Sequence, residues 1–100
     1  MSTEARREMG FLLRRVQEGD CLSLPHSRPM PSIGKACHEL RVNDKTKTWR
    51  LFYFVDSDAI VILEIIEKKT QKTAKPTINL CHKRLKHYEK STRHQEQDEH

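Results

Sequence analysis

The apolar residues of this chain are concentrated between Leu40 and Ile66, in runs separated by short polar segments. Segments 43–47 (NDKTK) and 56–58 (DSD) are both rich in residues that favour tight turns. The runs beside them are rich in aromatic and β-branched residues, which favour strands. Strands joined by such short turns pair antiparallel with their neighbours in sequence. This stretch therefore predicts a compact antiparallel meander.

Three strands are expected in the meander. In Cys37–Val42 apolar and charged residues alternate, and Thr48–Val55 is mainly aromatic and β-branched. Ala59–Ile66 is apolar on both faces, which predicts a central strand that is covered on both sides.

Helices are expected on both sides of the meander. Apolar residues between Ala5 and Val16 recur at helical spacing, and Gly19 supplies a stop signal. A second, short helix is expected from Pro76 to Tyr88, because proline is well suited to the first turn. We expect a disordered polar tail over residues 91–100.

Segment 20–36 contains three of the four prolines and shows no periodicity, so we expect an irregular connection. The apolar residues expected to hold this connection in place are Leu22, Leu24, Met30 and Ile33. The fold class is therefore α+β, with an N-terminal helix packed on a small twisted antiparallel sheet. One hundred residues suffice for one domain, which we place at residues 1–90.

Charge and cysteine content limit the classes of function. The formal net charge of +5 favours polyanionic partners such as RNA, DNA or an acidic protein surface. The three cysteines are widely spaced, which argues against a disulfide framework and a structural zinc site. There is no signal peptide pattern and no apolar run long enough for a membrane span, so a cytoplasmic protein without membrane association is expected.

Two arginines lie within the predicted strands. Strand geometry places Arg41 and Arg50 on one face of the sheet, with Glu39 beside Arg41. One interpretation is an ion pair with Glu39 or Glu64. The other is a bidentate phosphate clamp, which the planar guanidinium suits better than lysine does.

The segment EKKTQKTAKP, residues 67–76, contains four lysines and follows the third predicted strand. Taken alone, it is typical of a solvated turn. However, loops at strand ends of a rigid scaffold often carry function, and threonine hydroxyls can also contact phosphate.

The six histidines include no pair spaced as helical metal ligands, so neither a metal ion nor another cofactor is predicted. His26 or His38 could act as a general base, and the sequence does not select between them.

Three segments together resemble a known family. They are HELRVNDKTKTWRLFYF (38–54), IVILEIIEKKTQKTAK (60–75) and the 78–88 helix, and LPHSRPM (24–30) adds to the likeness. This combination resembles the HigB-like, phage-derived branch of the RelE/ParE toxin superfamily. The resemblance implies a RelE-like fold. Members usually begin with a strand ahead of the first helix, and that strand is expected to be missing here.

The resemblance also implies a function: a toxin of a type II toxin–antitoxin system that enters the ribosome and cleaves mRNA without a metal ion. Its expected partners are the ribosome, mRNA and a cognate antitoxin, often of the helix-turn-helix type, and no small-molecule substrate is expected. The alternatives are a ParE-like toxin that is not a nuclease, an inactive truncated member that only binds its antitoxin, and a general nucleic-acid-binding module.

Residue roles follow from the same resemblance. Arg41, Arg50 and Lys69 match the catalytic basic positions of the family. His87 and Tyr88 are candidates for the C-terminal contributors of the family. The remaining residues expected to contact RNA phosphates are Lys68, Thr70, Lys72 and Lys75.

Overall fold

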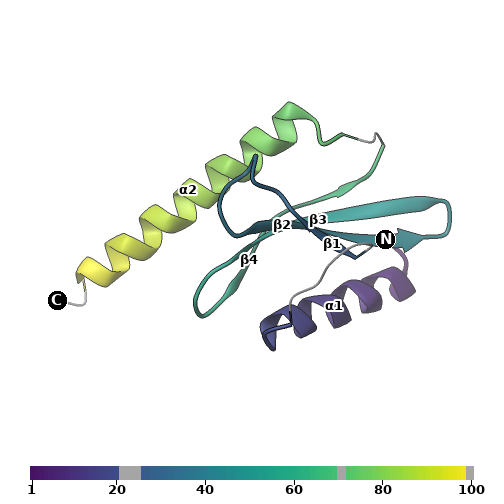
Figure 1. Cartoon of the computed structure of the whole chain (residues 1–100), viewed down its shortest axis with the longest axis horizontal. Helices are drawn as coiled ribbons and strands as arrows, with labels where there is room; N and C mark the ends of the chain where they lie inside the picture. The colour runs from purple at the N-terminus through teal and green to yellow at the C-terminus, as the bar shows by residue number, and fades with distance from the viewer. Residues whose placement is uncertain (21–25, 70–71, 99–100) are drawn as a thin grey trace.

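The computed structural model describes residues 1–20, 26–69 and 72–98, and side chains up to residue 92. Two helices enclose one sheet (Figure 1). In chain order the elements are α1 (Thr3–Gln17), β1 (Ser27–Pro29), β2 (Cys37–Asp44), β3 (Lys47–Val55), β4 (Ile60–Glu67) and α2 (Lys75–Asp98). The predicted α+β class and the antiparallel meander are both confirmed.

The sheet has the order β1-β2-β3-β4, and every neighbouring pair is antiparallel. β1 was not predicted and lies in the segment expected to be irregular. Its three residues are too few for a periodic signal, and Pro29 is tolerated because β1 is an edge strand. Met30 and Ile33 are buried as expected, whereas Leu22 and Leu24 lie outside the described residues.

Alternation along the strands divides the core into two apolar clusters. On the face covered by α1, the buried residues are Ala5, Met9, Leu12, Leu40, Val42, Leu51 and Tyr53. On the face covered by α2, they are Met30, Ile33, Cys37, Phe52, Leu63, Cys81 and Leu85. Figure 1 shows the two helices on opposite sides of the sheet. Cys37 and Cys81 are buried among these apolar residues, and burial raises the pKa of each thiol to about 11.

β4 was predicted to be a central strand, and this prediction is wrong. Among the described residues β4 pairs only with β3, so it forms an edge of the sheet. Ile62 and Ile65 lie opposite Tyr53 and Leu51, on the α1 face, and remain 50% and 40% exposed. The fully buried strand residues of the α1 cluster come from β2 and β3, and of β4 only Ile60 packs against the cluster among the described residues, so Ile62 and Ile65 are left uncovered. Apolar residues on both faces of a strand indicate that it is buried, but they do not show whether the strand lies at the centre or at the edge of the sheet.

The start of α1 is tied to the β2–β3 hairpin. The Ser2 hydroxyl accepts a hydrogen bond from the Ala5 amide (3.1 Å) and thereby caps the helix. The Asp44 carboxylate accepts hydrogen bonds from the Ser2 amide (2.8 Å) and the Trp49 indole (3.2 Å). These bonds fix the first turn of the helix beside a turn that lies 42 residues away in sequence.

α2 is longer than the predicted helix. It continues through the segment expected to be a disordered tail, as far as Asp98. Residues 89–98 include two glutamates, two glutamines, one lysine and one arginine and neither glycine nor proline, so nothing there stops a helix. Within the described residues, neither helix is both long and apolar enough to cross a membrane.

The edge position of β4 predicts very different costs for adjacent isoleucine and leucine substitutions. Leu63 is 2% exposed, so Leu63→Ala is expected to lower the free energy of unfolding by about 2–5 kcal/mol. Ile62→Ala removes a half-exposed side chain and should cost less than about 1 kcal/mol. Urea unfolding followed by circular dichroism measures both. Equal costs would mean that β4 is covered on both faces after all.

Candidate functional site

One face of the sheet carries polar residues in cross-strand rows, on the same side as α2. Arg28 pairs with Glu39, and Glu39 lies opposite Phe52. In the next row, Arg41 lies opposite Arg50, which lies opposite Ile66. The prediction that Arg41 and Arg50 share one face is confirmed by this register.

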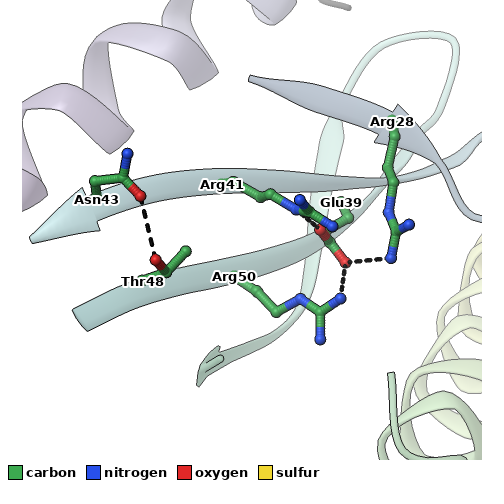
Figure 2. A network of polar contacts seen from close by, with 6 residues as sticks. All are labelled: Arg28, Glu39, Arg41, Asn43, Thr48 and Arg50. Carbon is green, nitrogen blue, oxygen red and sulfur yellow. Dashed lines mark hydrogen bonds and ion pairs between the residues drawn. The ribbon is translucent and has the colours of Figure 1, made fainter. Parts of the chain in front are cut away.

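Glu39 is the centre of this face. Its side chain is fully buried, and three arginines surround it (Figure 2). Arg41 Nε donates to Oε1 at 2.5 Å, Arg50 Nη2 lies 2.9 Å from Oε2, and Arg28 Nη2 donates to Oε2 at 3.3 Å. The ion pair with Glu39 that the sequence suggested is therefore present, and it includes a third arginine from β1.

The carboxylate of Glu39 is held in its charged form. Burial by itself would raise the pKa of this group, but the hydrogen bond from Arg41 and the charges of Arg50, Arg41 and Arg28 outweigh burial. The net result is a pKa below the ordinary value of 4.5. Three guanidinium groups thus share one negative charge, and the cluster as a whole remains positive.

Arg50 is the most buried of the three arginines, with 1% of its surface exposed. Its Nη2 is close to Glu39 without the angles of a hydrogen bond, and its Nε has no partner among the described residues. The buried Nε of Arg28 also lacks one. Buried guanidinium donors without acceptors are costly, and an anion supplies acceptors. Arg50 is buried against Glu39, so a direct contact between its guanidinium and a phosphate requires the surrounding side chains to move aside.

Lys68 joins the arginines from the end of β4. Its amide donates to the Thr48 carbonyl at 2.7 Å, which continues the register of β4 by one residue. Alternation therefore places Lys68 on the face of Arg41 and Arg50. The charge of Arg41, followed by partial burial and the charge of Arg50, lowers the pKa of Lys68, although Glu39 opposes the shift.

A pocket of about 270 Å³ opens next to these cations. Its lining is entirely polar: Glu8, His26, Arg41, Asn43, Thr48 and Lys68. Thr48 donates its hydroxyl to the Asn43 side chain at 3.2 Å (Figure 2). The volume lies below the usual range for sites of drug-sized molecules. A phosphodiester with part of one nucleotide suits both the size and the charge.

The other predicted lysines are not brought into the pocket. Lys69 follows Lys68 and is exposed, and Lys72 and Lys75 are exposed near the start of α2. Thr70 lies outside the described residues. The roles predicted for Lys69, Lys72, Thr70 and Lys75 stay predictions.

His87 and Tyr88 lie away from the arginines. Tyr88 donates to Asp56 at 2.7 Å, at the β3–β4 turn, and its ring packs edge-on against Phe54. Asp56 follows the end of β3, whereas Thr48, which lines the pocket, lies near its start, so this contact holds Tyr88 far from the pocket. His87 is exposed on α2 beside Lys83 and Lys90.

Sequence reasoning missed Arg28 and Glu8 as residues of the site and left His26 unplaced. Arg28 and His26 reach the site because β1 pairs with β2, and β1 was not predicted. The available signal for a strand was the alternation of His26 and Arg28 around the small residue Ser27, but the adjacent Pro29 argues against a strand. Glu8 comes from α1 on the other side of the sheet, and no sequence spacing reveals that approach.

The fold and the site together define a small α+β protein with a cationic pocket on one face of its sheet. The model of one family, the phage-derived Gp49-like proteins (DUF891), matches residues 1–86, so the chain belongs to that family. It is a RelE/HigB-type family associated with toxin–antitoxin systems. No curated protein and no solved structure matches the chain.

The buried carboxylate predicts a large cost for neutralising Glu39. Glu39→Gln leaves the three arginines without a counter-charge, so the free energy of unfolding should fall by about 3–5 kcal/mol at neutral pH. Glu64→Gln is the matched control, because Glu64 faces the more exposed Arg84 at 3.5 Å, and it should cost about 1 kcal/mol or less. Urea titrations at neutral pH give both values.

The same pair of proteins has an expected pH dependence. The pKa of Glu39 is lower in the folded state than in the unfolded state. The contribution of its charge to the free energy of unfolding is therefore complete above about pH 4.5 and is lost as the pH falls through the folded-state pKa. The difference in stability between wild type and Glu39→Gln should therefore shrink as the pH is lowered from about 7 to about 3. A difference that stays constant over this range would contradict the assignment.

Proposed function

We propose that this protein is a HigB-like toxin of a type II toxin–antitoxin system and cleaves mRNA on the ribosome. The observation that carries the proposal is the cluster of Arg28, Arg41 and Arg50 around the single carboxylate of Glu39, with Lys68 alongside. A positive cluster beside a polar pocket suits a phosphodiester. Membership of a toxin–antitoxin-associated family supports the biological context.

The proposed chemistry is attack of the ribose 2′-hydroxyl on the adjacent phosphorus, with departure of the 5′-oxygen. Negative charge grows on the phosphoryl oxygens in the transition state, and fixed cations lower its energy. Arg41 is 26% exposed and is already oriented by Glu39, so it can bind the phosphoryl oxygens at little further cost in side-chain entropy.

Lys68 is proposed for the role that the family resemblance gave to Lys69. It lines the pocket with Arg41, whereas Lys69 does not. The lowered pKa of Lys68 makes its ammonium a better proton donor to the leaving 5′-oxygen. Arg28 and Arg50 keep Glu39 ionised and add positive potential, and Lys69, Lys72 and Lys75 contact RNA outside the pocket.

The proposed partners follow from the same surface. An antitoxin that covers the pocket must bring negative charge to Arg41 and Lys68, because desolvating these cations without compensation is costly. We propose that such a cognate antitoxin holds the protein inactive, and that the ribosome and mRNA are its targets when it is released.

Substitution of Lys68 tests the proposed chemistry. Lys68→Ala should lower ribosome-dependent mRNA cleavage by about 10²–10³-fold, because one charge contact to the transition state is removed. Lys69→Ala should have a smaller effect, and Lys83→Ala, on the exposed side of α2, should have none. Primer extension on mRNA from a purified translation system, with unfolding curves for each variant, gives the rates. A larger loss in Lys69→Ala than in Lys68→Ala would return the role to Lys69.

The alternatives give other outcomes with the wild-type protein. Growth arrest in which mRNA stays intact but DNA is damaged indicates a ParE-like toxin. Antitoxin binding without growth arrest indicates an inactive member. Binding to RNA that weakens steeply with salt, without cleavage, indicates a nucleic-acid-binding module.

A further inference from the structure

His26 occupies a fixed position in the cationic pocket, and no role has yet been given to it. Its backbone carbonyl accepts a hydrogen bond from the Arg41 amide at 2.8 Å, which extends the β1–β2 ladder by one residue beyond Ser27. Alternation then puts the His26 side chain on the same face as Arg28 and Arg41. The side chain lines the pocket together with Arg41 and Lys68 and is exposed to an incoming ligand.

The other histidines with described side chains are placed elsewhere. His38 stacks on Tyr53, with ring centroids 5.4 Å apart, on the α1 face of the sheet. His82 is engaged through Nδ1 with the Ile33 carbonyl at 2.9 Å. His87 is exposed on α2. Of the two histidines that the sequence left open, His26 lines the pocket and His38 lies on the other face of the sheet.

The pocket supplies a proton donor in Lys68 but needs a proton acceptor for the 2′-hydroxyl. The arginines cannot serve, because a guanidinium stays protonated in proteins. Glu39 is buried beneath its three arginines and is held as an anion by them. Of the groups that line the pocket, His26 and Glu8 can accept a proton. Imidazole suits this task because it changes charge near neutral pH.

On the basis of the proposed function, we propose that His26 is the general base of the cleavage reaction. Neutral His26 takes the proton of the 2′-hydroxyl as the 2′-oxygen bonds to phosphorus. The bond from phosphorus to the 5′-oxygen breaks, and the 5′-oxygen takes a proton from the Lys68 ammonium. The products are a 2′,3′-cyclic phosphate and a 5′-hydroxyl. Water then removes the proton from His26 and returns one to Lys68.

The charged groups around His26 determine how the pocket responds to pH. The charged groups that line the pocket with His26 are Arg41 from β2, Lys68 from the end of β4 and Glu8 from α1. Asn43 and Thr48 are neutral and complete the lining. A rate that depends on neutral imidazole rises with pH through the imidazole range and then levels off.

The test is the pH dependence of cleavage in His26→Gln under single-turnover conditions. Wild type should show the rising limb between about pH 5.5 and 7.5. His26→Gln should be slower by about 10²–10⁴-fold, should lose that limb, and should regain rate when free imidazole is added. His38→Gln is the matched control and should keep the wild-type profile, because His38 lies on the other face. Unfolding curves verify that each variant is folded.

The outcomes separate this inference from the proposed function. If wild type cleaves mRNA and the His26→Gln variant keeps the rising limb, His26 is not the base, however slow the variant is. If the limb disappears in Glu8→Gln instead, the role belongs to Glu8. If wild type does not cleave mRNA under any condition, the proposed function itself fails and the inference fails with it.

Discussion

The buried carboxylate of Glu39 is the interaction on which the rest of this surface depends. It allows Arg50, which is almost fully buried, to lie within the sheet at all, since an unpaired guanidinium there would be prohibitively costly. It also orients Arg41 from below, so that the outer side of that guanidinium remains available to a ligand. The carboxylate organises the cations without cancelling them, because three arginines share one negative charge.

The meander is well suited to building such a site. Each strand contributes one cross-strand neighbour, so residues far apart in sequence meet in rows: Arg28 with Glu39, then Arg41 with Arg50. Lys68 follows the last residue of β4, and its backbone hydrogen bond to Thr48 continues the pairing with β3 by one residue. Every element of the pocket except Glu8 is therefore positioned by backbone ladders rather than by flexible loops. Such positioning is rigid, and rigidity is what electrostatic stabilisation of a transition state requires.

Much of this arrangement could be predicted from the sequence, and the failures have identifiable causes. Period-two alternation correctly placed Glu39, Arg41 and Arg50 on one face, and both turn segments were correct. β1 escaped because three residues that include a proline carry no periodic signal. The family resemblance favoured Lys69 over Lys68 for the catalytic role, but the sequence could not show which of the two shares a face with the arginines, because a shift of one residue moves a side chain to the other face. The position of β4 at an edge depends on what α1 covers, which composition does not encode.

The link between Ser2 and Asp44 bears on how the protein is handled in the laboratory. Because the first residues of α1 are held against the β2–β3 hairpin, any polypeptide attached ahead of Met1 emerges at that hairpin. Asn43 and Thr48, which line the pocket, flank the same turn. An affinity tag or fluorescent fusion at this end would therefore begin next to a turn that carries two of the pocket residues. The far end of α2 is at the opposite side of the molecule (Figure 1), and it is the better attachment point for immobilisation or labelling.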